Sequence, residues 1–364
     1  MLLFLVASVA CTNTAPHNTY NVLIGTYTEE TDSKGIYTFA VDATMGTARQ
    51  LSIAEEVVNP SYLALSSDKK NAYAVNEAGE SSVITAFAFD ANTGVLRIIN
   101  DRPSPDIDPC YVDVTRNHIV TASYSSGSIA VYERTDSGAV DEVVQTIYHT
   151  GRSVNKQRQK SSHVHQTIFT PDKRFLLVCD LGTDKVLSYA YHPEEDENIL
   201  SLADTLTVKL GSGPRHIAFN SKGNIAYLLQ EIDATLTVLS IEEGGQLAVL
   251  QQVTIANDST ENGAAAIHLS PDGKFVYATN RGNANNIACF AIDANNGLLT
   301  MVEQVSSGGE GPRDFAITPD GNYVFVAHQY TNNITIFERD KQTGRLATTG
   351  KEWTVDAPVC LVVY

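Results

Sequence analysis

GPRHIAFNSKGNIAYLLQE, residues 213–231, has the pattern of a β-hairpin. Apolar residues alternate before a polar turn at 221–224, and a second apolar run follows the turn. This pattern predicts two antiparallel strands joined by a tight turn. Because a hairpin returns to the side from which it leaves, we expect Arg215, near its start, and Glu231, at its end, to lie close together.

The same pattern recurs along the chain. Further copies begin at Pro60, Pro109, His163, Ala264 and Pro312. The copies start about 45 to 55 residues apart, which is the period of four-stranded propeller blades. Each is followed by a third strand, a polar loop that often contains Asn or Asp with Gly, and a last strand, and such loop residues favour hairpin reversal. The sequence therefore predicts an all-β repeat protein with four antiparallel strands in each blade.

The two ends of the chain are expected to form one further blade together. Residues 20–28 and 35–42 are expected to be strands, but no inner strand precedes them. The last residues, 358–364, repeat the start of a unit, a proline followed by apolar residues, and then the chain stops. We predict that this C-terminal strand is the innermost strand of the first blade and closes a seven-bladed β-propeller.

Composition agrees with one large β domain, which we place at residues 20–364. The chain has 364 residues, 43% of them hydrophobic, and its strand pairs are evenly spaced without helical segments. Acidic residues outnumber Lys and Arg by 42 to 25, for a formal charge of −17. A charge of this sign argues against a nucleic-acid partner. An anionic ligand would need a local cluster of cations.

Residues 1–19 are expected to be a signal segment and linker. The apolar run MLLFLVASVA is followed by Cys11, and this resembles a bacterial lipoprotein signal with Cys11 as the lipidated residue, although a basic start is missing. The run is too short to span a bilayer. The sequence thus favours a periplasmic or membrane-anchored protein, attached only through a lipid on Cys11. The alternative is a cytoplasmic protein with a frayed N-terminus.

The other cysteines lie in apolar strand contexts without metal-binding spacing. They are Cys110, Cys179, Cys289 and Cys360. We interpret them as buried small hydrophobic residues, and we expect no disulfide framework, metal or cofactor.

A loop at residues 151–162, GRSVNKQRQKSS, is rich in Lys and Arg and leads to His163 and His165. The simpler interpretation is a solvated loop. The alternative is a basic lip over an anion site.

Equivalent positions of the repeats bring polar residues to one end of the ring. The second position of the hairpin holds Ser61, Cys110, His165, Arg215, Ala265 and Arg313. The position after the second strand, in the blades with equal hairpin length, holds Glu77, Leu181, Glu231, Arg281 and Gln329. Arg presents a planar fork that suits carboxylate or phosphate, so this polar ring is predicted to be an anion site.

Structural roles remain open for several of these residues. Arg215 and Glu231 could form a plain ion pair that only stabilises the fold. His216 and Asp314, one residue further along their strands, are expected to point away from the ring. Only one of His163 and His165 can share the position of Arg215, and His165 has the matching count.

Several motifs, in this order and spacing, are similar to those of the seven-bladed lactonase family. They are HVH at 163–165, GPRH at 213–216 with Glu231 downstream, NRG at 280–282 and GPRDFAITPDG at 311–321. That family includes propeller-type 6-phosphogluconolactonases and the fungal enzyme that cycloisomerises 3-carboxy-cis,cis-muconate. The resemblance extends over residues 20–364. It implies an active site whose members fall on His165, Arg215, Glu231 and Arg281.

The expected function is hydrolysis of a small anionic lactone, with 6-phosphogluconolactone as the leading substrate. Ring opening needs a delivered water, a stabilised oxyanion and a proton for the leaving oxygen. His165 and Glu231 would be the acid and base, in an order left open, and Arg215 and Arg281 would stabilise charge. Further substrate-binding residues would be Arg313, Glu77, Gln329 and His163.

Two alternatives have different consequences. A non-catalytic propeller would bind carbohydrate or a partner protein in the periplasm, on a broad face with its charged side chains paired among themselves. A muconate-type lactonizing enzyme would share the pocket and differ in substrate. A lactonase should instead gather His165, Glu231 and the arginines around one ligand-sized pocket.

Overall fold

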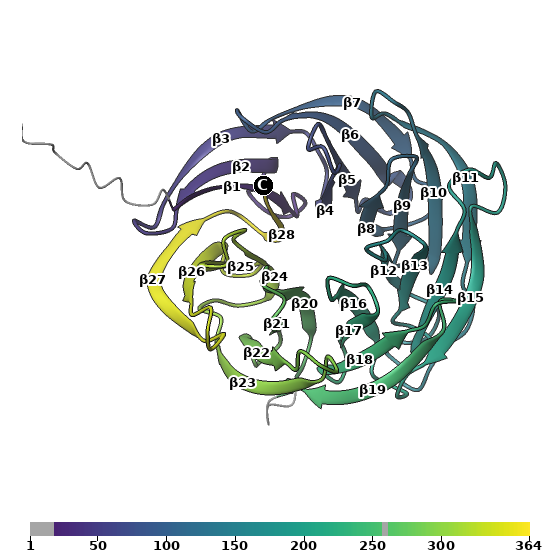
Figure 1. Ribbon diagram of the computed structural model, residues 1–364. Helices are drawn as coiled ribbons and strands as arrows, with labels where there is room; N and C mark the ends of the chain where they lie inside the picture. The colour runs from purple at the N-terminus through teal and green to yellow at the C-terminus, as the bar shows by residue number, and fades with distance from the viewer. Residues whose placement is uncertain (1–17, 257–260) are drawn as a thin grey trace, which may run out of the picture.

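The computed structural model describes residues 18–256 and 261–364, which form a ring of seven four-stranded antiparallel sheets (Figure 1). The innermost strands, from blade 1 to blade 7, are β28 (Pro358–Val363), β4 (Pro60–Leu65), β8 (Pro109–Val114), β12 (Val164–Phe169), β16 (Pro214–Phe219), β20 (Ala264–Leu269) and β24 (Pro312–Ile317). The second strands are β1 (Thr19–Thr26), β5 (Asn71–Asn76), β9 (His118–Ser123), β13 (Phe175–Asp180), β17 (Ile225–Gln230), β21 (Phe275–Asn280) and β25 (Tyr323–His328). The predicted seven-bladed propeller is confirmed.

The outer half of each blade completes the sheet. The third strands are β2 (Gly35–Asp42), β6 (Val83–Asp90), β10 (Ser128–Arg134), β14 (Lys185–Tyr191), β18 (Thr235–Ile241), β22 (Asn286–Ile292) and β26 (Asn333–Arg339). The outermost strands are β3 (Thr47–Glu55), β7 (Val95–Pro103), β11 (Val140–Tyr148), β15 (Leu200–Thr207), β19 (Leu247–Thr254), β23 (Leu299–Ser306) and β27 (Leu346–Thr354). One short 3-10 turn, η1 (Gly79–Ser81), follows β5. No helix in the described ranges is long and apolar enough for a membrane span.

The ring closes as the sequence predicts. Strand β28 pairs antiparallel with β1, from Val22 opposite Val363 to Thr26 opposite Pro358. The carboxylate of Asp314 on β24 accepts the Leu361 amide at 2.8 Å, which ties blade 7 to this closing strand. Blade 1 therefore contains both ends of the described chain, and β1 has a partner strand on each of its two edges.

The hydrophobic core lies between neighbouring blades. Residues of β1 and β25, such as Ile24 and Phe325, are fully buried in one shared cluster, although the two strands are far apart in sequence. The second strands are buried at nearly every position, because sheets pack on both of their faces. The outermost strands consist mainly of exposed and half-buried positions, as expected for the outer surface of the ring.

Every inner strand has a β-bulge at its second position. In blade 5, Pro214 pairs with Gln230 and His216 pairs with Leu229, so Arg215 is the extra residue. The same register shift recurs at Ser61, Cys110, His165, Ala265, Arg313 and, in the closing strand, Val359. A bulge bends the strand and redirects the side chain of the extra residue. The repeated bulge thus explains why this position supplies site residues from several blades.

Candidate active site

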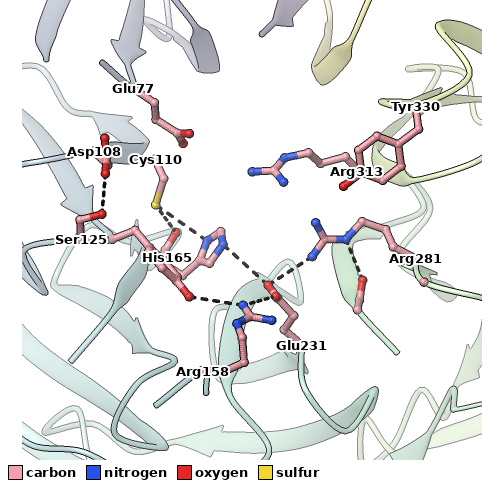
Figure 2. Close-up of a pocket in the computed structure, with 13 residues that line it drawn as sticks. Glu77, Asp108, Cys110, Ser125, Arg158, His165, Glu231, Arg281, Arg313 and Tyr330 are labelled. Carbon is pink, nitrogen blue, oxygen red and sulfur yellow. Dashed lines mark hydrogen bonds and ion pairs between the residues drawn. The ribbon is translucent and has the colours of Figure 1, made fainter. Parts of the chain in front are cut away.

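One end of the ring, which we call the mouth, contains a cavity of about 490 Å³ (Figure 2). Pockets for small molecules usually have volumes of about 300 to 1,000 Å³. Five of the expected site residues line this cavity: Glu77, His165, Glu231, Arg281 and Arg313. The mouth is therefore a ligand-sized pocket rather than a broad flat face.

A repeated backbone hydrogen bond places the residues that follow the second strands. The amide of Glu231 donates to the Gly213 carbonyl at 2.7 Å, and the amide of Arg281 donates to Gly263 at 3.1 Å. The same bond, between the residue after the second strand and the residue before the inner strand, recurs in the other five blades. Side chains at this position consequently stand around the mouth at equivalent points of the ring.

Glu231 is the centre of the charged cluster and is only 5% exposed. Its Oε2 accepts the Nε–H of Arg215 at 2.9 Å and lies 3.3 Å from Nη2 of Arg281. Its Oε1 accepts Nη2–H of Arg158 at 2.7 Å, and Nε2 of His165 lies 3.9 Å from Oε2. One buried carboxylate therefore orders three guanidinium groups and faces one imidazole. Figure 2 shows its contacts with Arg158, Arg281 and His165.

These contacts set the protonation states of the cluster. Burial alone would raise the pKa of Glu231, but the charges of Arg281, Arg215 and Arg158 lower it to about 2. Burial and the charges of Arg215 and Arg313 keep the pKa of His165 well below 6.5. At neutral pH Glu231 is therefore an anion and His165 is a neutral imidazole. Because three guanidinium groups stabilise its negative charge, Glu231 is a weak base.

His165 is close to a buried thiol as well. The Sγ of Cys110, another bulge residue, lies 3.9 Å from Nδ1 of His165 and donates to the His165 carbonyl at 3.5 Å. Burial raises the pKa of Cys110 far above its ordinary value, because a thiolate would lose its hydration there. Cys110 is thus a neutral thiol in the cavity wall, which agrees with its interpretation as a small hydrophobic residue.

Arg215 lies behind Glu231 and does not line the main cavity. It is 2% exposed, and its Nη1 donates to the Ala265 carbonyl in the next blade. It lines a second, narrow space of about 10 Å³, which shares His165 and Arg313 with the lining of the cavity. Burial lowers the pKa of Arg215 to about 10, so the group is still a cation at neutral pH. Its contacts make it a positioning residue for Glu231.

The expectation that His216 and Asp314 point away from the ring is wrong. Both line the same narrow space as Arg215 and Arg313, and the His216 ring nitrogens lie 3.3 Å from Nη1 of Arg215. The reason is the bulge, which breaks the simple alternation of side chains. Burial and the charge of Arg215 keep the pKa of His216 well below 6.5, so it is a neutral ring beneath the arginine cluster.

Arg313 and Glu77 are joined through a tyrosine. Nη2 of Arg313 donates to the Tyr27 hydroxyl at 2.7 Å, and this hydroxyl donates to Glu77 Oε2 at 2.7 Å. The other oxygen of Glu77 accepts the Ser61 hydroxyl at 2.8 Å. Burial raises the pKa of Glu77, in contrast to the lowered pKa of Glu231 at the equivalent position of blade 5. The two carboxylates thus have opposite electrostatic environments.

Two expected substrate-binding residues lie beside the cavity rather than in its lining. The ring of His163 stacks on Tyr124 with centroids 4.4 Å apart, and its Nδ1 meets the Tyr124 carbonyl at 2.9 Å. Gln329 follows the second strand of blade 7, as Glu231 does in blade 5, and its amide donates to the Gly311 carbonyl at 3.0 Å. Cys11, the expected lipidation site, lies outside the described residues.

Several lining residues are additional to the expected set. They are Asp108, Tyr124, Ser125, Arg158 and Tyr330. Arg158 comes from the basic loop at 151–162, which therefore contributes to the mouth as the lip alternative proposed. Tyr124 follows the second strand of blade 3, the position that Glu231 has in blade 5. The hairpin of blade 3 is shorter, so a count based on equal hairpin lengths did not reach Tyr124. Asp108 and Ser125 belong to loops, for which the repeat pattern gave no signal.

The described ranges contain no group of three His, Cys, Asp or Glu side chains arranged as metal ligands. The functional groups of the mouth are guanidinium, carboxylate, imidazole and hydroxyl groups. They can donate and accept hydrogen bonds, hold an anion and transfer a proton.

A closed ring of seven blades with a charged, ligand-sized cavity at its mouth defines a β-propeller with a small-molecule site. The family model described as a seven-bladed β-propeller lactonase matches residues 21–363. The chain therefore belongs to this lactonase family, as the motifs indicated.

Individual relatives match this chain over nearly their whole length. A 6-phosphogluconolactonase of Bacillus subtilis is 33% identical over 343 residues, which are 93% of this chain and 96% of the relative. A 6-phosphogluconolactonase of Formosa agariphila is 31% identical over 349 residues, covering 94% and 99% of the two chains. The solved periplasmic gluconolactonase of Pseudomonas aeruginosa is 35% identical, with a TM-score of 0.89 over 95% of this chain and 99% of that one.

Proposed function

We propose that the protein hydrolyses a small anionic sugar lactone and that 6-phosphogluconolactone is its leading substrate. The observation that carries this proposal is the placement of neutral His165 in one cavity with Arg281 and Arg313, beside the Glu231 carboxylate, which orders Arg281. Membership of the lactonase family and the names of the relatives support the reaction class.

The chemistry follows from these groups. Water attacks the lactone carbonyl carbon while His165 takes one of its protons. The carbonyl oxygen becomes an anion, which the guanidinium group of Arg281 stabilises, while Arg313 holds the remote anionic group of the substrate. When the bond between this carbon and the ring oxygen breaks, the ring oxygen takes the proton from His165. The product is the open-chain hydroxy acid, and the imidazole is neutral again.

In this scheme Glu231 is the orienting group and His165 is the acid and base. Glu231 holds Arg215, Arg281 and Arg158 by hydrogen bonds or ion pairs of 2.7 to 3.3 Å. It also faces His165 at 3.9 Å, where its negative charge stabilises the imidazolium formed in the transition state. A carboxylate with a pKa of about 2 is ill suited to take the proton itself.

The cavity retains cationic donors for an anionic substrate. Arg281 uses Nε and Nη2 in protein contacts, and Arg313 uses Nη2. Among the described residues, Nη1 of Arg281 and both Nε and Nη1 of Arg313 have no hydrogen-bond partner. The guanidinium groups of Arg281 and Arg313 extend into the cavity in Figure 2, and such groups match the oxygens of a phosphate or carboxylate.

The direct test measures acid release from a panel of lactones by pH-stat titration. The rate of spontaneous hydrolysis is subtracted from each measured rate. 6-Phosphogluconolactone should be hydrolysed with a higher kcat/KM than glucono-δ-lactone, because the arginines bind its phosphate. Equal kcat/KM values would reject the phosphorylated sugar as the preferred substrate. Rates equal to the spontaneous reaction for every lactone would reject lactone hydrolysis itself.

We further propose that the protein is exported and anchored by a lipid on Cys11. The apolar run before Cys11 supports this, and the gluconolactonase of Pseudomonas aeruginosa is named as periplasmic. The wild-type protein should fractionate with membranes, whereas Cys11→Ala should appear unprocessed or in the soluble fraction. Recovery of the wild type in the cytosol with Met1 intact would contradict export.

A further inference from the structure

The two walls of the cavity differ in the hydrogen-bonding groups that they offer. Arg281 and Arg313 belong to blades 6 and 7, whereas Asp108 and Ser125 belong to blade 3, on the other side of the ring. Figure 2 shows the two pairs facing each other across the cavity. The first wall contributes cationic donors, and the second contributes a carboxylate and a hydroxyl. A substrate that fills the cavity meets both walls.

Asp108 is held by the chain around it. Its φ of 53° lies in the left-handed region. Its carbonyl accepts the Tyr124 amide at 2.9 Å, which is the backbone hydrogen bond that recurs at the mouth in every blade. Its Oδ1 accepts the Gly79 amide at 3.0 Å, and its Oδ2 accepts the Ser125 hydroxyl at 2.5 Å. None of the ion pairs in the described ranges involves Asp108. Its charge is thus not neutralised by a protein cation.

Asp108 and Ser125 together offer acceptors to the cavity. An ionised carboxylate has about four lone-pair sites, and the two hydrogen bonds to Asp108 occupy two of them. The Ser125 hydroxyl donates its single hydrogen to Asp108, so any further hydrogen bond of this hydroxyl is one that its oxygen accepts. The groups that satisfy such a wall are hydroxyl donors, and an anionic group placed there would be repelled.

We infer that Asp108 and Ser125 form a hydroxyl-binding wall that selects polyhydroxylated lactones, an inference that rests on the proposed lactonase function. The arginine wall holds the anionic end and the reacting carbonyl, and the Asp108 wall receives sugar hydroxyls. A lactone that carries carboxylates and no hydroxyls, as in muconate chemistry, leaves this wall without donors and meets its negative charge. The pair Asp108 and Ser125 therefore distinguishes sugar lactones from muconolactones.

The test compares two six-membered lactones, glucono-δ-lactone with its hydroxyls and δ-valerolactone without them. Asp108→Asn and Asp108→Gly are suitable variants, because Asn and Gly tolerate a positive φ. We expect kcat/KM for glucono-δ-lactone to fall about 10-fold in Asp108→Asn and up to about 100-fold in Asp108→Gly. For δ-valerolactone it should change by less than about 2-fold. Ser126→Ala is the matched control, since the Ser126 hydroxyl accepts the Ile107 amide at 2.8 Å in the same region but does not line the cavity.

Equal losses on the two lactones, or no loss on either, would overturn the inference. Calorimetric titration with gluconate separates this result from a failure of the proposed function. If the wild type hydrolyses neither of these lactones nor 6-phosphogluconolactone, lactone hydrolysis is rejected, but weaker gluconate binding in Asp108→Gly than in Ser126→Ala would still support the hydroxyl-binding wall. Equal gluconate affinity of these two variants would reject the wall.

Discussion

Replacing Glu231 with Gln should destabilise the protein as well as reduce its activity. The substitution keeps the shape of the side chain but removes the negative charge that faces Arg158, Arg215 and Arg281. Arg215 is 2% exposed and would then be a buried cation without its counter-ion. Removing one partner of a buried ion pair typically costs about 3 to 5 kcal/mol.

The lowered pKa of Glu231 gives a second measure of this cost. A carboxyl group whose pKa falls from 4.5 to about 2 on folding contributes about 3 kcal/mol to the free energy of unfolding at neutral pH. Because the folded-state pKa is depressed, this contribution is complete above pH 4.5 and disappears as the pH falls through 2. The stability difference between wild type and Glu231→Gln should therefore fall to about half near pH 3.

Urea titrations at pH 7 and pH 3 measure this difference. Glu77→Gln is the matched control, because Glu77 has the equivalent position in blade 2 and burial raises its pKa. We expect Glu77→Gln to cost at least about 2 kcal/mol less than Glu231→Gln at pH 7. Equal costs for the two variants, or a cost of Glu231→Gln that is independent of pH, would refute the reasoning.

Two other predictions concern closure of the ring and substrate binding. Deletion of residues 358–364 removes β28 and leaves one edge of β1 without a partner strand, so the melting temperature should fall sharply. An unchanged melting temperature in a thermal scan would contradict this role of the strand. Arg313→Ala should raise KM for 6-phosphogluconolactone by about 10-fold or more with a smaller change in kcat, if Arg313 binds the remote anion equally in the ground and transition states. Steady-state kinetics measure both constants, and a loss confined to kcat would instead place Arg313 at the reacting carbonyl.

The sequence predicted the ring and much of its mouth because the repeat has a constant length. Where the hairpin length is conserved, counting from the turn reaches Glu77, Glu231 and Arg281, and the structure places all three in the cavity wall. The same count missed Tyr124, since the hairpin of blade 3 is shorter. A count that starts from the first residue of each inner strand and allows for hairpin length would have found it.

Other features depend on structure that no strand periodicity encodes. Alternation placed His216 on the far side of its strand, but a bulge at Arg215 brings both residues to the axis of the ring. Arg158 and Asp108 reach the cavity from loops whose paths depend on contacts with other blades. The proposal of His165 rather than Glu231 as proton acceptor also depends on the structure, because it rests on the three arginines that contact Glu231.

The central claim is that His165 accepts and returns the proton in lactone hydrolysis. It is tested most directly by the kcat of His165→Asn on 6-phosphogluconolactone, measured by acid release beside His192→Asn, a substitution of an exposed histidine on the outer part of blade 4. The account predicts that His165→Asn lowers kcat by about 10² or more with KM changed only a few-fold, and that His192→Asn has no effect. A kcat of His165→Asn equal to that of the wild type would contradict it.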